Sequence, residues 1–489
     1  MKKDKGSSIL EVLVAISILT LGLAAATMLS FANQSLKTDT DTSHEALFKA
    51  KEILEEARAV SREDFSAVNT SSPEIEDIYT KQLLVLDETQ CRKNVLSKLT
   101  WKVSPLRPQT IELTTILGDV AGVLALGGDC LIELPESNWD NPQRFASNTF
   151  SPGKPTALDV FNKIVYLGVD QNPFLFIADT NPATLGQNSG LFVNFANGFS
   201  TKDVINAIDV VSFTDSSGNK KNYAYTAMAT STRQLMVIDV TDIFNPVVVA
   251  TRQLNNVDPA GSFPNGYRLF VYKDKLYIVT RETAGREFHI FDISDRSNPI
   301  ELGGGTNINT TLNAIVVRDQ RISSTTMRFA YTASTLNGGE VLVYDVTDPA
   351  NNGTVTEIVL ARQNLSGNQD GENVYLVGNK LYFGRQSTPS GPELYVYDTS
   401  DPTVGMTALG FQDIGTGILD IIVVGHFGFL ATPKANKEFQ VWNISDPGNV
   451  TLIKELNFGN IVEQGIEYEP DFIYAIGQAI PNFQILYSP

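Results

Sequence analysis

The residue types that most often carry out enzyme or metal chemistry are few and scattered in this chain of 489 residues. Three histidines, His44, His289 and His426, and two cysteines, Cys91 and Cys130, lie far apart, without the spacing of a zinc site. No Gly-x-Ser-x-Gly nucleophile, phosphate-binding or dinucleotide-binding motif occurs. The sequence therefore predicts no catalytic residue, no bound metal and no cofactor.

One carboxylate is a candidate because it borders a long uncharged segment. Glu11 lies four residues after Ser7, at the edge of an uncharged run from Val12 to Ala32 that is 21 residues long. A helix needs about 20 apolar residues to cross the hydrocarbon core of a bilayer, so this run predicts a membrane-spanning helix. A carboxylate inside a membrane is costly and is a functional candidate. The alternative is a Glu11 side chain that reaches water at the interface.

Residues 7–62 are predicted to form one long helix, of which about residues 7–32 span the membrane. From Ala46 to Val60 the apolar residues recur at steps of three and four, the spacing of one helical face. A secretory signal peptide would have a shorter apolar region followed by a small-residue cleavage site. The lysines of residues 1–6 are expected to stay in the cytoplasm, which places everything after the helix outside.

The segment from Gly6 to Ile16, GSSILEVLVAI, resembles the class III signal of type IV pilins and of the pseudopilins of type II secretion systems. The resemblance implies that residues 1–6 are a leader, which a prepilin peptidase removes after Gly6, and that the new N-terminus at Ser7 is methylated. The family usually has Phe at the position of Ser7, a departure that bears on methylation more than on cleavage. The longer phrase EVLVAISILTLGL is most similar to minor pilins.

The same resemblance gives Glu11 a role. In the family the matching glutamate pairs with the N-terminal amine of a neighbouring subunit during filament assembly. Physical chemistry agrees, because a buried carboxylate is tolerated when a positive group meets it. The implied partners are other pilin subunits through the helix, the prepilin peptidase, and the inner membrane before assembly.

Residues 63–135 are predicted to form a small β head. After a loop-like stretch over residues 63–77, the candidate strands are Lys81–Leu86, Leu96–Val103 and Ile111–Ile116, which would form a meander against the helix. The phrases LTWKV and IELTTIL resemble the sheet of minor pilin heads.

Cys91 and Cys130 flank this sheet. A disulfide between them is chemically allowed outside the membrane. It would close a loop of about 38 residues and contribute roughly 3–4 kcal/mol in the loop-entropy model. Pilin heads often carry such a clasp, and we expect it here. The alternative is two free thiols in a host without periplasmic oxidation.

A phrase recurs between residue 170 and the C-terminus with a period of roughly 40 to 55 residues, within a predicted propeller over residues 142–489. It reads MVIDVTDIFNPVVVA from Met236, HIFDISDRSNPIELG from His289 and YVYDTSDPTVGMTALG from Tyr395. Two further apolar segments precede each copy, so each unit supplies three strands and a fourth after an Asp-rich turn. Four short antiparallel strands at this period predict a propeller blade.

The Asp-rich turn that ends each phrase has a structural explanation. Asp, Asn, Ser and Thr side chains accept backbone N–H groups at such turns, and a later Pro cannot extend the strand ladder. We expect turn caps rather than calcium ligands, because a calcium loop has denser oxygen ligands and a fixed glycine. The predicted caps are Asp239, Asp242, Asp292, Asp295, Asp345, Asp348, Asp398, Asp401, Asn443 and Asp446.

The repeat count predicts seven four-stranded blades. The seventh unit starts near Ile466 and lacks its fourth strand, and residues 142–150 match that strand, so we expect them to close the last blade and remove the open edges. The phrases IDVTD, FDISD and YDVTD are similar to the LVIVD-type repeats of bacterial surface and secreted proteins, which specify a fold and not a function. The expected fold class is an α+β pilin-like part, a long α-helix with a small antiparallel sheet, followed by an all-β propeller.

Composition and charge exclude some partners. Hydrophobic residues make up 42% of the chain and charged residues 19%, which is typical of folded proteins. The formal net charge of −18 argues against binding to nucleic acid and to anionic membrane surfaces. The acidity is expected to keep an exposed protein soluble.

Four acidic residues, Asp159, Asp209, Glu372 and Asp420, fall near the predicted innermost strands. They could line one mouth of a central channel, but we expect solvated strand-end residues instead. His289 and His426 occupy different places in the repeat and are not expected to converge.

The sequence therefore predicts a minor type IV pilin, placed at a filament tip, that displays its propeller at the cell surface for adhesion to a ligand the sequence does not identify. One alternative is a pseudopilin of a type II-like secretion system. Another is a surface-anchored propeller enzyme, a hydrolase or lyase. The N-terminus would lie in the cytoplasm before assembly, and the propeller would be extracytoplasmic.

Overall fold

The computed structural model divides into two compact units, Met1–Val123 and Leu124–Pro489. It describes residues 6–63, 65–89, 92–104, 107–118, 139–149, 153–171, 174–180, 192–195, 203–214, 219–255, 265–322, 325–349, 353–389, 391–458, 463–469, 472–478 and 481–488. We call the first unit's sheet and the helix against it the head, and the second unit the body.

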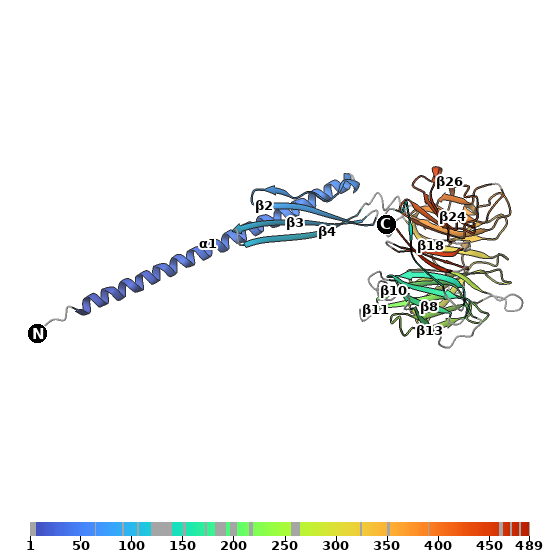
Figure 1. Ribbon diagram of the computed structural model, residues 1–489, viewed down its shortest axis with the longest axis horizontal. Helices are drawn as coiled ribbons and strands as arrows, with labels where there is room; N and C mark the ends of the chain where they lie inside the picture. The colour runs from blue at the N-terminus through green and yellow to red at the C-terminus, as the bar shows by residue number, and fades with distance from the viewer. Residues whose placement is uncertain are drawn as a thin grey trace. The chain divides into compact units, whose positions relative to one another are not determined.

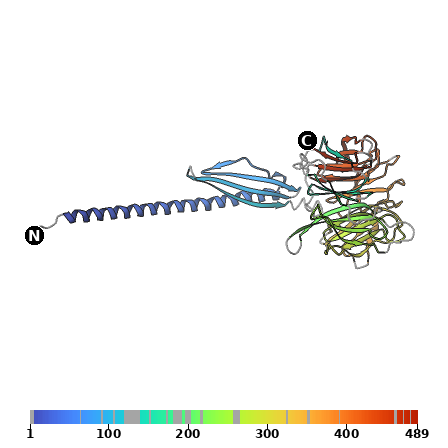
Figure 2. The same ribbon diagram turned by 60° about the horizontal axis from the view of Figure 1, so that its bottom comes forward.

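The first unit is built on one helix, α1 (Gly6–Glu63). Its second half packs against the head sheet, which lies alongside it in both views (Figures 1 and 2). Ala46, Ala50, Leu54 and Ala57 are buried along one face at steps of three and four. Three of these four are alanines, so the sheet can approach the helix closely.

The head sheet is antiparallel in the order β1 (Glu74–Glu76), β2 (Tyr79–Thr89), β3 (Arg92–Ser104) and β4 (Arg107–Gly118). Val95, Leu99 and Trp101 alternate along β3 and face the helix. The three predicted strands are present but longer. The stretch over residues 63–77, expected to be a loop, contains η1 (Phe65–Ala67) and β1, so that expectation was wrong in part.

The described part of the body consists of short strands in seven sheets, a propeller-like all-β arrangement. In chain order, the first three sheets are β6 (Pro155–Phe161), β7 (Ile164–Val169), β8 (Leu175–Asp179) and β9 (Phe192–Phe195); β10 (Val204–Thr214), β11 (Lys220–Ala229), β12 (Leu235–Asp239) and β13 (Val247–Arg252); and β14 (Gly266–Tyr272), β15 (Lys275–Thr280), β16 (Phe288–Asp292), β17 (Ile300–Gly304) and β21 (Gly353–Thr354).

The next three sheets are β18 (Leu312–Ile322), β19 (Thr325–Ser334), β20 (Val341–Asp345) and β22 (Thr356–Glu357); β23 (Gly371–Val377), β24 (Lys380–Arg385), β25 (Leu394–Asp398) and β26 (Thr407–Gln412); and β27 (Asp420–Val424), β28 (Phe427–Ala431), β29 (Phe439–Asn443) and β30 (Thr451–Leu456). Two short 3-10 helices, η2 (Val359–Ala361) and η3 (Pro447–Asn449), lie in the connections.

The last sheet joins the two ends of the body. It contains β31 (Glu463–Glu469), β32 (Phe472–Gly477), β33 (Phe483–Tyr487) and β5 (Gln143–Asn148). β5 pairs antiparallel with β33, from Gln143 opposite Tyr487 to Asn148 opposite Phe483. The fourth strand of this sheet therefore precedes all the other described strands of the body in sequence.

The first strands of the seven sheets contact one another in succession, from β6 through β10, β14, β18, β23 and β27 to β31, and β31 contacts β6. Hydrogen bonds cross each of these seven junctions. One hydrogen bond at each junction, with the donor residue named first, joins Val210 to Asp159, Val271 to Asp209, Asp319 to Tyr272, Asn313 to Gly371, Asn373 to Asp420, Ile466 to Asp420, and Lys163 to Glu469.

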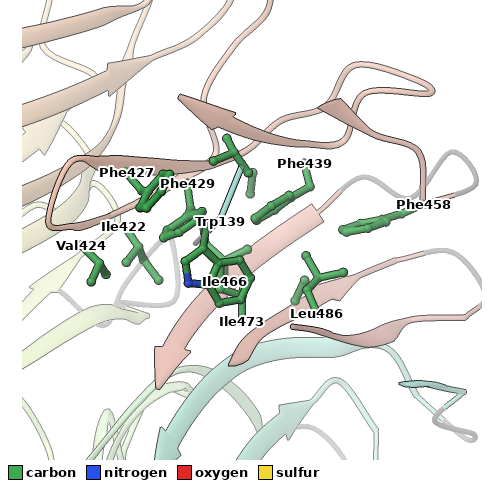
Figure 3. Packing of buried hydrophobic residues seen from close by; sticks show 13 residues of the cluster. Trp139, Ile422, Val424, Phe427, Phe429, Phe439, Phe458, Ile466, Ile473 and Leu486 are labelled. Atoms are coloured by element: carbon green, nitrogen blue, oxygen red, sulfur yellow. The ribbon is translucent and has the colours of Figure 1, made fainter. Parts of the chain in front are cut away.

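Trp139 belongs to the body core, although the propeller was expected to begin only at residue 142. Its side chain is fully buried beside Phe429 (Figure 3), with 5.3 Å between the two ring centroids. The Trp139 ring also lies 6.2 Å from that of Tyr468 in the seventh sheet. An aromatic side chain of this size contributes strongly to core stability. The segment entering the body is therefore held by both side-chain packing and the strand β5.

Candidate functional site

The first half of α1 presents an apolar surface with one acidic side chain. Every large apolar side chain from Leu10 to Phe31 is 51–73% exposed. The hydroxyl groups of Ser17, Thr20 and Thr27 donate to backbone carbonyl oxygens of the preceding turn, so these polar groups need no water. Among the described residues, this is the helix that is long and apolar enough to cross a membrane.

The predicted processing residues lie at the start of this helix. Gly6 and Ser7 are the first two residues of α1, and Glu11 follows one turn later with its side chain exposed. The helix therefore presents Glu11 beside the apolar stretch, where a carboxylate requires a positive partner once water is removed. The candidate disulfide residues Cys91 and Cys130 lie outside the described residues.

The body contains a central cavity of about 320 Å³. All seven first strands contribute to its lining, so it lies where the sheets meet. Its polar lining includes Asn206, Arg268, Asn373, Asp420 and Glu467. Arg268 is the one cationic side chain among the described residues that line it, and its guanidinium donates to the backbone carbonyl oxygen of Asn206 at 2.9 Å.

Three acidic residues join neighbouring sheets near this cavity. Asp159 accepts a hydrogen bond from the backbone N–H of Val210, and Asp209 accepts one from Val271 at 2.7 Å. Asp420 accepts a hydrogen bond from the backbone N–H of Ile466 at 2.9 Å. The expectation of solvated strand-end residues was therefore wrong in part for these three, because their half-buried carboxylates bond backbone groups of the adjacent sheet.

Of these three residues, Asp420 lines the cavity, and all three side chains are half-buried. The partial loss of surrounding water acts on their pKa values. Burial raises the pKa of Asp209 and of Asp420 to about 6. Burial, with the charge of Asp209 second, raises the pKa of Asp159 well above its usual range. Burial also raises the pKa of Glu467, on which the charges of Asp159, Asp420 and Asp209 act as well. Sequence reasoning did not identify Glu467.

Glu372 lies at the start of β23 beside other polar groups. The Gln386 side-chain amide donates to Glu372 at 2.8 Å and to Asp370 at 3.1 Å. Burial raises the pKa of Glu372. These groups already satisfy one another, so the arrangement does not by itself indicate a ligand.

The turn residues accept backbone hydrogen bonds two residues ahead. Asp239, Asp242, Asp292, Asp295, Asp345, Asp398, Asp401, Asn443 and Asp446 each accept one, at 2.8–3.1 Å. Asp348 is exposed, and the turn beyond it lies outside the described residues. A hydrogen bond from the Ser294 hydroxyl is the main cause of a lowered pKa for Asp292.

A second repeated acidic position was missed in the sequence. The residue immediately before the third strand of a sheet is buried, and its side chain accepts the backbone N–H of a residue about 20 positions later. These residues are Gln234, Glu287, Glu340, Glu393 and Glu438. The signal was visible, because Gln or Glu precedes the phrases LMVID, FHIFD, VLVYD, LYVYD and FQVWN.

The two histidines of the body do not lie in one site. His289 is fully buried, with Nδ1 2.8 Å from Glu301 Oε1 and Nε2 3.0 Å from the carbonyl oxygen of Arg286. His426 is exposed in the turn between β27 and β28. Within the part of the chain that the structure describes, no three His, Cys, Asp or Glu side chains are placed to hold a metal ion.

Comparisons with known proteins find two family models. The model of the prokaryotic N-terminal methylation motif matches residues 1–27, and that of the LVIVD repeat matches residues 271–305. No curated protein matches the chain.

Solved structures with similarity to the chain include the following three proteins. The computationally designed Ika8 protein is 12% identical, with a TM-score of 0.44, covering 71% of this chain and 99% of its own. A putative 6-phosphogluconolactonase from Bacteroides fragilis NCTC 9343 is 12% identical, with a TM-score of 0.42, over 80% and 98%. The WD40 β-propeller domain of Doa1 is 10% identical, with a TM-score of 0.45, over 71% and 98%.

Similarity at this level says nothing about activity. The two family models, by contrast, match the segments in which the sequence signals were found. The chain thus carries the type IV pilin N-methylation signal on a long apolar helix, followed by an LVIVD repeat within a propeller-like all-β body.

Proposed function

We propose that the protein is a minor type IV pilin subunit, located at the filament tip, that displays a β-propeller outside the cell for adhesion or surface recognition. The observation that carries the proposal is the joining of two parts in one chain. An exposed apolar helix with a pilin-type signal and one carboxylate, Glu11, precedes a large propeller-like body. A body of this size is too bulky to repeat along a tightly packed shaft, which favours the tip.

The proposal includes the partners that a pilin requires. A prepilin peptidase cleaves between Gly6 and Ser7, and the N-terminus lies in the cytoplasm before assembly. Other pilin subunits then pack against α1, and Glu11 pairs with the N-terminal amine of a neighbour. The apolar surface from Leu10 to Phe31 supports this, because it needs either lipid or other helices around it.

The proposal also treats the body as a closed seven-bladed propeller. The succession of contacts from β6 to β31 and back to β6 supports closure, as do the hydrogen bonds at all seven junctions. The pairing of β5 with β33 supports a last blade completed by the segment over residues 142–150. A closed ring has no open end and is a rigid platform for recognition loops.

Immunogold labelling of whole cells with an antibody to the body tests the proposal. Gold at filament tips is the expected result, and gold along the length would place the subunit in the shaft instead. Absence from all filaments, with recovery in a secretion complex, would support the pseudopilin alternative. Hydrolysis by the purified protein that Asp420→Asn abolishes would support an enzyme.

A further inference from the structure

Seven equivalent residues, one from each sheet of the body, surround one level of the central cavity. In every sheet but the sixth, the pairing of the first strand with the second skips one residue of the first strand, and the residue after this skip lines the cavity. In the sixth sheet the equivalent residue is Asp420, opposite Ala431. We call these residues the axial ring.

The composition of the axial ring leaves room for a ligand. Four members have no side chain beyond Cβ, namely Ala157, Ala207, Ala314 and Gly465. The other three are a cation, an amide and a carboxylate, namely Arg268, Asn373 and Asp420. A Cβ at Gly465 would lie 3.6 Å from Oδ2 of Asp420, so a larger residue there would cover this carboxylate.

Arg268 is the cation of the axial ring, and part of its hydrogen-bonding capacity is unused. Its Nη1 group donates to the backbone carbonyl oxygens of Asn206 at 2.9 Å and Tyr267 at 3.2 Å. Among the described residues, its Nε and Nη2 groups have no acceptor, and no carboxylate lies within 4.0 Å of the guanidinium nitrogens. These two groups form one edge of the guanidinium, and a carboxylate binds such an edge through two parallel hydrogen bonds.

The cavity also presents negative charge. The carboxylates of Asp420 and Glu467 line it, and the charge of Asp420 acts on Glu467. A purely anionic ligand would be repelled by these two groups, whereas an amine alone would leave the open edge of Arg268 without an acceptor. A molecule that carries both a carboxylate and an ammonium group matches both parts of the lining.

An apolar layer lies next to the axial ring. Residues two apart on a strand face the same side, and on four of the first strands the residue two positions after the axial ring is apolar and also lines the cavity. These residues are Phe270, Val316, Tyr375 and Ile422. The cavity volume of about 320 Å³ is at the small end of the range for ligand pockets, roughly 300–1,000 Å³, so the ligand must be small.

We propose that the central cavity of the body binds a free amino acid with an apolar side chain. The carboxylate of the ligand binds Nε and Nη2 of Arg268, its ammonium group faces Asp420 and Glu467, and its side chain packs on the apolar layer. The inference concerns only residues of the body and does not rest on the proposed role in adhesion, so each can fail without the other.

Isothermal titration calorimetry of the full-length protein in detergent tests the proposal, with L-alanine, L-valine, L-leucine and L-phenylalanine as probes. At least one of these amino acids should bind at millimolar concentration or below. Two analogues of that amino acid, one without the amino group and one without the carboxylate, should each bind at least about tenfold more weakly, because each leaves a charged group of the cavity without its partner.

Variants assign the binding to the cavity. Arg268→Gln should lower the affinity at least about tenfold, because the carboxylate loses a charged, two-bond partner. Arg281→Gln is the matched control and should bind normally, since Arg281 also lies over the Tyr267 ring, at 4.7 Å, but is exposed and does not line the cavity. Ala207→Leu should also weaken binding by narrowing the cavity, and it serves as the second variant if Arg268→Gln does not fold.

Three results would overturn the proposal. The first is that the native protein binds none of the four amino acids, a measurement that does not depend on any variant. The second is that either analogue binds as tightly as the amino acid, which would make the cavity a site for simple cations or anions. The third is unchanged affinity in both Arg268→Gln and Ala207→Leu, which would place the ligand elsewhere.

Discussion

Buried and exposed acidic residues recur together in several repeats of the body, and they act differently. Glu393 is fully buried and accepts backbone hydrogen bonds from Thr388, Ile414 and Gly415, thereby fixing the connection that leads to the next sheet. Asp398, five residues later, accepts one hydrogen bond at the surface. Removing an acceptor from buried donors costs more than removing one that water can replace.

We therefore predict that Glu393→Gln lowers the free energy of unfolding of the body by about 3 kcal/mol, because its amide cannot accept all three N–H groups. Asp398→Asn should change it by less than about 0.5 kcal/mol, since Asn443 makes the same hydrogen bond in the sixth sheet. Denaturant unfolding of the two variants measures the difference. Equal losses of unfolding free energy in the two variants would show that the buried Glu393 contributes no more to stability than Asp398.

A second prediction at this scale concerns Glu11. Glu11→Ala should leave membrane insertion intact but lower incorporation into filaments by at least about tenfold, because an unpaired buried amine costs about 3–5 kcal/mol. Glu52→Ala, also exposed on α1, is the matched control. Blots of membranes and of sheared filaments give both quantities, and equal incorporation of the two variants would exclude a role for Glu11 in assembly.

At the level of elements, periodicity predicted the long helix and the repeated four-stranded sheets, and both predictions are confirmed. Periodicity is local, so it places a strand but not its partners. The parallel pairing of β21 with β17 is one case, because Gly303 and Gly304 meet Gly353 and Thr354, which lie about 50 residues further along the chain. The carboxylates of Asp159, Asp209 and Asp420 are another case, since each accepts a backbone N–H of the neighbouring sheet.

The pairing of β21 with β17 explains the glycine at Gly303. Gly303 has φ +151°, and a Cβ there would lie 2.2 Å from the carbonyl oxygen of Gly353. We predict that Gly303→Val displaces β21 and costs about 2–3 kcal/mol. Gly448→Ala, where the nearest atom would be 3.4 Å away, should be close to neutral. Hydrogen exchange at Val355, whose N–H bonds Gly304, reports the displacement.

At the scale of the whole molecule, the proposed processing predicts a change of mass. The mature protein should be shorter than the encoded one by residues 1–6 and should begin at Ser7, with one added methyl group if the N-terminus is methylated. A Gly6→Val variant should keep the leader, whereas Ser8→Ala should be processed normally. Mass spectrometry of protein from membranes distinguishes these forms, and a native protein that retains Met1 would contradict the pilin assignment.

The position of β5 has a mechanical consequence. Trp139 and β5 are the first described residues of the body along the chain, so under the proposed function tension between the helix and a bound ligand reaches them before the other described strands. The interactions that resist this tension are the packing of Trp139 against Phe429 and the hydrogen-bonded pairing of β5 with β33. Under the proposed function of a closed, ligand-binding propeller, rupture of that pairing would be the first step by which load opens the body.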